Sequence, residues 1–207
     1  MGWNVKKIKD IEDEVDQNEK IKRKRWRSSE CLIRETKNIY RKAFSETQLL
    51  DILGVETFKN GYSYHCISGG DVDSLSFLKV ILRQQKLEYL LFSTWCMAAD
   101  DVMAIGEWLE NGTLKKIDAY LGEIFQRSYP MEWKKLNEIF KEYNCGTISV
   151  FRNHSKVYAG YGDKYAFAIE SSANINTNPR TEQTCITIGE DIYQFYREFY
   201  SKIKSFI

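Results

Sequence analysis

The spacing of hydrophobic positions changes along the chain and predicts its secondary structure. Between residues 62 and 146, short apolar runs typical of buried strands are followed by stretches with apolar residues at helical spacing. The expected strands are 62–68, 89–97 and 115–125, and the expected helices are 69–85, 98–112 and 128–146. Three strand–helix units in succession predict a largely parallel sheet with right-handed crossovers.

Residues with known preferences for helix ends support these three helices. Asp71 stands where the first helix needs an N-cap, and Gly112 stands where the second needs a C-cap. Pro130 lies near the first position of the third helix, where its missing N–H costs nothing. The helix boundaries are therefore expected close to these residues.

After residue 146 the apolar runs follow one another with shorter connections. The expected strands are 147–151, 154–160, 165–171 and 184–188, with a turn at 161–164. The closing segment, 189–207, has apolar residues on one helical face. The sequence predicts an α/β fold, a mixed, largely parallel β-sheet flanked by helices.

The first 55 residues differ from the rest in their charge pattern. Acidic residues predominate from Asp10 to Glu19, basic residues from Lys20 to Arg27, and residues 28–54 are expected to be helical. One interpretation is a solvated arm whose acidic and basic halves pair within or between chains. The other is a nucleic-acid-binding patch, with cations on phosphates and an indole on a base. That patch consists of Lys22, Arg23, Lys24, Arg25 and Trp26. We expect a charged helical arm over 1–55 and an α/β domain over 56–207.

Composition limits the classes of protein that fit the chain. With 207 residues and 43% hydrophobic content, it is long enough for one domain and an arm. A net charge of +1 means that any nucleic-acid binding must be local. The five Cys residues lack zinc-ligand spacing and are expected to be free thiols in a reducing compartment. No apolar run approaches the roughly 20 residues of a membrane span. We expect a cytoplasmic protein without membrane, metal or cofactor.

A group of polar residues between positions 154 and 182 carries the candidate chemistry. His154 and Lys156 are expected on one face of a strand, because strand side chains alternate in direction. The next strand leads to Ser172 and Asn174, and Glu182 begins the strand after that. Lys156 and Asn174 would donate to phosphate oxygens, the imidazole would act as nucleophile or acid, and Glu182 would hold its tautomer. The alternatives are a surface histidine and a loop of turn-forming residues.

Two other sets of polar residues favour structural roles. His65 lies in the first expected strand and is read as a buried, hydrogen-bonded histidine. Asp100 and Asp101 stand where the helix over 98–112 begins, and N-capping explains them better than a metal site.

The order of these residues resembles the phospholipase D superfamily. The elements of the resemblance are His154-x-Lys156, a hairpin, Ser172-Ala173-Asn174 and the downstream Glu182. The run "SSANINTNPRTEQ" is similar to the form that this block takes in single-motif, phage- and plasmid-type members, and the likeness covers roughly 62–207. Two positions depart from the family pattern. Tyr161 replaces the usual Asp five residues after the Lys, and Ser171 replaces a usual Gly.

The resemblance implies a metal-independent phosphodiesterase. In the family one His attacks phosphorus to form a phosphohistidine, and a second His protonates the leaving oxygen. Because this chain has one His-x-Lys, it resembles members that form homodimers and share one site across a two-fold axis. A nuclease acting on DNA or RNA is the first hypothesis. The alternative is a catalytically weakened nucleic-acid-binding or structural protein of phage or mobile-element origin.

Overall fold

One eight-stranded sheet forms the centre of the protein. The structure, a computed structural model, describes residues 34–54, 58–69, 72–175 and 180–206. These residues belong to one compact unit, Arg34–Ile207. The strand order across the sheet is β1-β2-β8-β7-β6-β3-β4-β5.

Strands and helices alternate in the first two thirds of the chain, and four of the strands come close together after that. The strands are β1 (Lys37–Ala43), β2 (Tyr62–Ser68), β3 (Leu87–Thr94), β4 (Ile117–Gly122), β5 (Ile148–Phe151), β6 (Val157–Gly162), β7 (Ala166–Ser171) and β8 (Glu182–Ile188). The helices are α2 (Glu46–Leu53), α3 (Ser74–Leu82), α4 (Ala99–Glu110), α5 (Phe125–Ser128), α6 (Pro130–Tyr143) and α7 (Glu190–Ser201).

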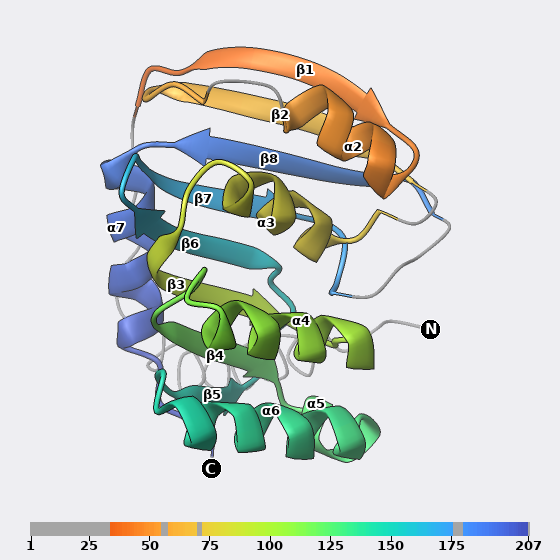
Figure 1. The fold of residues 1–207 in the computed structure, drawn as a ribbon, viewed down its shortest axis with the longest axis vertical. Coiled ribbons are helices and arrows are strands. Elements are labelled where there is room, and N and C mark those ends of the chain that lie inside the picture. Colours follow the sequence, from red (N-terminus) through yellow and green to blue (C-terminus); the bar gives the residue numbers. More distant parts are fainter. Residues whose placement is uncertain (1–33, 55–57, 70–71, 176–179, 207) are drawn as a thin grey trace, which may run out of the picture. The chain divides into compact units, whose positions relative to one another are not determined.

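Helices cover both faces of the sheet. Figure 1 shows α2, α3, α4 and α6 along the near face, and α7 behind the sheet. The apolar side chains of α3 are almost all buried, as expected for a helix between a sheet and a second helix, α2. On the opposite face, α7 packs on β6 and β7. This is the layered architecture that βαβ units produce.

The strand directions bring many chain ends to one edge of the sheet. β1 pairs parallel with β2, and β3, β4 and β5 are parallel to one another. β6 and β8 run opposite to the strands on either side of them. The carboxyl ends of β3, β4, β5 and β7 therefore meet the amino ends of β6 and β8 at one edge. Ligands of open α/β sheets bind at such an edge.

The predicted mixed α/β sheet flanked by helices is confirmed. The strands at β2 and β3 and the helices at α4 and α6 lie where apolar spacing placed them. Pro130 begins α6, as predicted. Gly112 follows α4 with a φ of 71°, a left-handed conformation that suits Gly after a helix.

Several local predictions are wrong. Residues 37–43 were expected in a helix, but they form β1, the outermost strand, which pairs with β2. The compact unit that begins at Arg34 includes β1 and α2, and the expected division at 55/56 stays a prediction. Asp73 caps α3 through its side chain, in the role assigned to Asp71, which lies outside the described residues. Ala98 precedes α4 and no side chain caps that helix, so capping does not explain Asp101.

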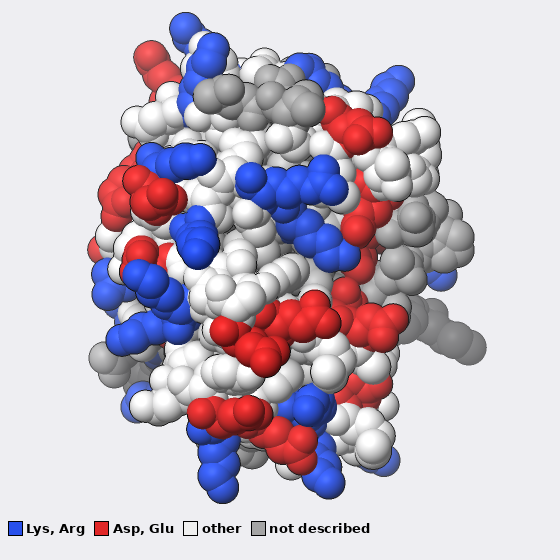
Figure 2. All heavy atoms as spheres, viewed as in Figure 1, with Lys and Arg blue, Asp and Glu red and all other residues white. Residues whose placement is uncertain are grey.

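Charges are distributed over the near face without a large patch of one sign. Figure 2 shows basic and acidic side chains interspersed over the helices of that face. In the part of the chain that the structure describes, no helix has the length and apolar character that crossing a membrane requires. The residues of the basic patch, 22–26, lie outside the described residues.

Candidate active site

His154 and Lys156 lie in the connection between β5 and β6, at the sheet edge where the strand ends meet. β6 begins at Val157, so both residues precede the strand in which they were predicted. The alternation of strand side chains therefore does not set their relative orientation. Their side chains come together by direct contact instead, since Lys156 Nζ lies 3.0 Å from His154 Nδ1 and 2.7 Å from the His154 carbonyl oxygen.

Asn153 fixes the shape of this connection. Its Nδ2 lies within hydrogen-bond distance of Ser93 Oγ (2.8 Å), the Tyr120 carbonyl oxygen (3.0 Å) and the Thr94 carbonyl oxygen (3.3 Å). Its Oδ1 accepts from Ser155 N at 3.0 Å and lies 2.6 Å from Ser155 Oγ. The buried carboxamide of Asn153 thereby fastens this connection to β3 and β4. It also holds Ser155, the residue after His154.

Lys156 is a buried cation, with only 7% of the residue exposed. Burial lowers the pKa of its ammonium, because the charged form loses hydration, while nearby Cys96 and Glu182 partly offset this effect. Burial also raises the pKa of the Cys96 thiol. A dehydrated ammonium interacts more strongly with an anion than a solvated one does. Lys156 is therefore well placed to bind a phosphate oxygen beside the imidazole.

Trp95, directly after β3, contacts the imidazole from the side. The ring centroids of Trp95 and His154 are 5.5 Å apart, at an interplanar angle of 56°. Gly122, the last residue of β4, makes room for the indole. A Cβ at Gly122 would lie 2.6 Å from Trp95 Cδ1, closer than real Cβ atoms come. The aromatic side of the site thus depends on the absence of a side chain at position 122.

Ser172 and Glu182 face each other across the ends of β7 and β8. Ser172 Oγ donates to Glu182 Oε2 and accepts from the backbone N–H of Gln183 at 2.9 Å. The side-chain hydrogen bond of Glu182 runs to Ser172, and among the described residues none joins it to His154. The predicted contact between Glu182 and the imidazole is therefore wrong. The imidazole is held by Lys156 and Trp95 instead.

Ser171, at the usual Gly position, is accommodated by its neighbours. Its Oγ lies 2.7 Å from Thr184 Oγ1 and accepts from the backbone N–H of Ala173 at 3.1 Å. The hydroxyl thus closes the turn that follows β7. This departure from the family pattern adds hydrogen bonds and leaves the turn intact.

Asn174 lies in the segment that leaves β7 and passes the amino end of α3. Its carbonyl oxygen accepts from Ser74 N at 3.2 Å, which anchors the backbone. Its Oδ1 is buried and has no hydrogen-bond partner. A buried acceptor without a donor is costly. Oδ1 can only accept, so a contact of this side chain with a phosphate oxygen would have to come from Nδ2.

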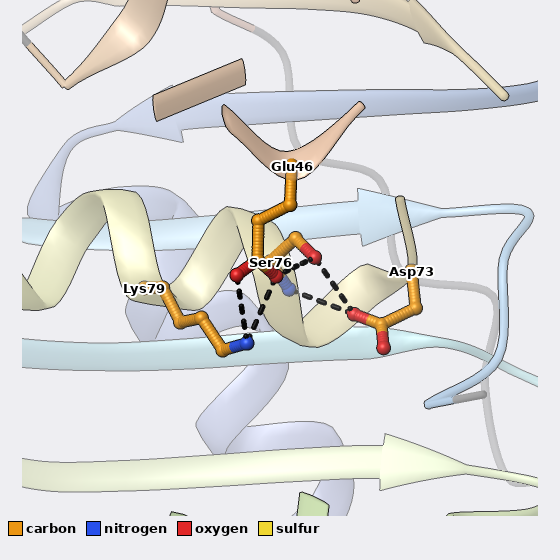
Figure 3. Close-up of polar contacts among 4 residues, drawn as sticks. All are labelled: Glu46, Asp73, Ser76 and Lys79. Atoms are coloured by element: carbon orange, nitrogen blue, oxygen red, sulfur yellow. Dashed lines mark hydrogen bonds and ion pairs between the residues drawn. The ribbon is translucent and has the colours of Figure 1, made fainter. Parts of the chain in front are cut away.

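A network of charged and hydrogen-bonding side chains connects α2 with α3. Figure 3 shows Glu46, Asp73, Ser76 and Lys79 joined by hydrogen bonds. Lys79 Nζ lies 2.8 Å from Glu46 Oε2, and Asp73 Oδ1 accepts from Ser76 N at 2.8 Å. Burial raises the pKa of the Asp73 carboxyl, and it raises that of Asp101 to about 7, with the Asp73 charge adding to the effect. Hydrogen bonds from Ser76 and Lys79 engage Asp73 and Glu46 within the network, so these two acids act on stability.

The other sequence-predicted residues lie away from this edge or outside the described residues. His65 is half-buried, and its Nε2 lies 3.2 Å from Asn38 Oδ1, which agrees with a structural role. Tyr161, at the position of the usual Asp, lies in β6 five residues beyond Lys156, roughly 16 Å away along an extended strand. Within the described ranges, no three His, Cys, Asp or Glu side chains are grouped as metal ligands.

Sequence reasoning missed Asn153, Trp95 and Gly122. Asn153 adjoins the motif, and an Asn before a histidine in a loop is a signal that was readable. Trp95 and Gly122 come from the ends of β3 and β4, so only the sheet topology brings them to His154.

Comparison with known proteins supports the fold. No protein-family model matches the sequence, and no curated protein sequence matches it. Phosphatidylserine synthase from Haemophilus influenzae Rd KW20 has a similar structure, with a TM-score of 0.50, 14% sequence identity and 68% of this chain covered. Polyphosphate kinase from Porphyromonas gingivalis has a TM-score of 0.49 at 14% identity and covers 66% of this chain.

The described domain therefore shares its α/β fold with part of the phosphatidylserine synthase. The chain spans 37% of the length of the synthase and 25% of the length of the kinase. At such low identity the likeness concerns the fold alone. The single-motif, nuclease-like subgroup stays a prediction.

Proposed function

We propose that this protein is a metal-independent phosphodiesterase that cleaves nucleic acid at the edge occupied by His154 and Lys156. The observation that carries the proposal is a buried lysine ammonium in contact with an exposed imidazole. Burial of a cation is costly unless an anion or a function compensates it. A phosphate group supplies that anion and lies within reach of the imidazole.

The proposed reaction has two steps. In the first, His154 attacks phosphorus, a P–N bond forms, the P–O bond to the leaving group breaks, and a second imidazole protonates the leaving oxygen. In the second, that imidazole takes a proton from water, the water oxygen attacks phosphorus, and the P–N bond breaks. Lys156, Ser172 and Asn174 bind the nonbridging oxygens and stabilise the charge that develops on them.

Glu182 has a supporting role in this proposal. It holds Ser172 by a hydrogen bond and balances the charge of Lys156. Both effects place the phosphate-binding groups before substrate arrives.

The second imidazole is proposed to come from a second copy of the chain. His65, the other histidine of the sequence, lies in β2 and contacts Asn38, away from His154. A symmetric dimer with two His154 side chains across its axis supplies nucleophile and acid from one residue type.

A mixing experiment tests the shared site. His154→Ala chains are mixed with wild-type chains, allowed to exchange, and assayed on bis(p-nitrophenyl) phosphate. Activity should fall steeply, roughly as the square of the wild-type fraction, because mixed dimers lack one imidazole. His65→Ala is the matched control and should change stability rather than turnover. A linear fall would contradict the shared site, and an active His154→Ala chain would contradict the role of the imidazole.

Nucleic acid is the proposed substrate class because a basic segment, 20–27, precedes the domain in the sequence. The competing function is a catalytically weakened protein that binds nucleic acid, motivated by Tyr161 in place of the usual Asp. Turnover of a single-stranded oligonucleotide in EDTA separates them. Binding without turnover, with the same affinity after His154→Ala, would favour the binding protein.

A further inference from the structure

A tyrosine-lined pocket lies on the α7 side of the sheet, away from the candidate active site. It encloses about 350 Å³, at the lower end of the roughly 300–1,000 Å³ of small-ligand pockets. Its walls come from β3, β4, β6 and α7. The lining residues used below are Tyr89, Lys116, Tyr120, Tyr161, Tyr193 and Arg197.

Three of the tyrosine rings form a contiguous aromatic surface. Tyr161 and Tyr193 have centroids 5.3 Å apart in a T-shaped arrangement, and Tyr89 lies 6.3 Å from each of them. Tyr161 is 38% exposed and Tyr193 is 2% exposed, so Tyr161 presents the exposed ring of the cluster and Tyr193 packs against it. An exposed aromatic ring of this kind can stack on the face of a planar ligand.

The charged groups of the pocket leave a small excess of positive charge. Glu88 pairs with Lys115 at 2.7 Å, so Asp118 is the lining acid without an ion pair among the described residues, and it accepts from Tyr89 Oη at 2.6 Å and from Thr147 N at 2.7 Å. Lys116 and Arg197 line the pocket, and the structure gives neither of them an ion pair among the described residues. Two cations beside an aromatic wall match a planar ring joined to a phosphate.

We infer that this pocket binds one unpaired nucleotide of the nucleic-acid substrate, with its base on the exposed Tyr161 ring and its phosphate on Arg197 and Lys116. The inference rests on the proposed function. An unpaired nucleotide is required because bases in a duplex are already stacked and have no free face. The protein therefore acts on single strands or on single-stranded ends.

The position of Tyr161 supports a nucleotide pocket that is separate from the site of cleavage. It stands where the family pattern has Asp, near the far end of β6 from Lys156. The replacement therefore leaves the contacts of His154 intact and contributes the most exposed wall of the pocket. The separation of roughly 16 Å along β6 means that a bound strand must span more than one nucleotide to reach both sites.

Fluorescence anisotropy tests the pocket on the full-length chain. In a His154→Ala background, which prevents cleavage, the probes are fluorescein-labelled single strands of 3 and 12 nucleotides and a 12-base-pair duplex. Tyr161→Ala should weaken binding of the 12-mer by about five-fold or more, the lower limit for loss of one base stack. Tyr161→Phe keeps the ring and should bind nearly as wild type. The 3-mer, which can occupy the pocket without reaching His154, should also lose affinity in Tyr161→Ala, and the duplex should be unaffected by either change.

Arg197 gives an independent measurement. Arg197→Ala should reduce the slope of log affinity against log salt for the 12-mer by about one. Lys134→Ala, on exposed α6, is the matched control and should leave that slope unchanged. Equal affinity and slope for wild type, Tyr161→Ala and Arg197→Ala would overturn the inference. AMP that binds as tightly as the 12-mer and displaces it would overturn it in favour of a free nucleotide.

Failure of the proposed function looks different. Hydrolysis of bis(p-nitrophenyl) phosphate, too small to span both sites, should be unchanged by Tyr161→Ala when His154 is present. If the wild-type chain hydrolyses neither that compound nor oligonucleotides, the phosphodiesterase is refuted, whereas loss of 12-mer binding in Tyr161→Ala would still support the pocket.

Discussion

Replacement of Lys156 by Met measures separately what the buried charge contributes to activity and what it costs in stability. Methionine has nearly the length of the lysine side chain and ends at Cε, without the ammonium. The substitution removes the contacts of Nζ with His154 Nδ1 and the His154 carbonyl oxygen. A charged hydrogen bond contributes about 1.5–3 kcal/mol to stability. His154 is exposed, so water replaces the lost donor at little cost.

Removing the charge also stabilises the folded state, by a free energy similar to that lost with the hydrogen bonds of Nζ. Lys156 is 7% exposed, and burial lowers its pKa, so the folded state pays to dehydrate the ammonium. We therefore expect the free energy of unfolding to change by less than about 1 kcal/mol, with a small gain as the favoured sign. Activity should fall by about 10²- to 10³-fold, the usual effect of removing one preorganised group that stabilises transition-state charge.

Urea unfolding and hydrolysis of bis(p-nitrophenyl) phosphate measure the two effects on one preparation. Lys141→Met on α6 is the matched control and should leave activity unchanged, because Lys141 is exposed and far from His154 in the fold. A loss of 3 kcal/mol or more in Lys156→Met would mean that the lysine is structural. Unchanged activity would refute its role in binding phosphate.

Three further predictions follow from the buried polar groups. Asp101 has a pKa of about 7 in the folded state against about 3.9 when unfolded, so the free energy of unfolding should fall as pH rises from about 4 to about 7. Asp101→Asn should remove this pH dependence. In urea unfolding at pH 8, it should raise the free energy of unfolding by up to about 4 kcal/mol. Asn153→Ala should lower stability by about 1–3 kcal/mol and reduce kcat with little change in KM, because it misplaces His154 without touching substrate; an unchanged kcat would contradict this positioning role. Activity should persist in EDTA, since Lys156 and the imidazole carry the charge in the proposed reaction; strict dependence on Mg²⁺ or Mn²⁺ would refute the mechanism.

The central strands and most helices were predictable because burial gives them distinct patterns. β3 is apolar along most of its length, as a strand covered on both faces must be. β1 was missed because an edge strand needs little apolar content. Lys37, Asn38 and Lys42 are exposed, and charged residues on edge strands discourage pairing with other chains. Such a sequence resembles a solvated helix.

The role of the candidate site residues stays a prediction, and their geometry could not be predicted from the sequence. His154 and Lys156 were recognised by spacing, but strand alternation gave the wrong cause of their proximity. Asn153 and Ser155 bond to each other and to the ends of β3 and β4, which bends the chain before β6 begins. Side-chain hydrogen bonds of this kind compete with strand pairing and leave no periodic signal.

The departure at Tyr161 illustrates how one strand serves two chemical environments. β6 begins beside the buried Lys156 and ends among the aromatic side chains of α7. A carboxylate at position 161 would be close to Asp118, whose oxygens already accept from Tyr89 and Thr147, and two nearby carboxylates repel each other. A tyrosine avoids that repulsion and extends the aromatic surface. The same replacement that reads as a damaged motif in the sequence is therefore compatible, in the fold, with the proposed phosphate site and the proposed nucleotide pocket.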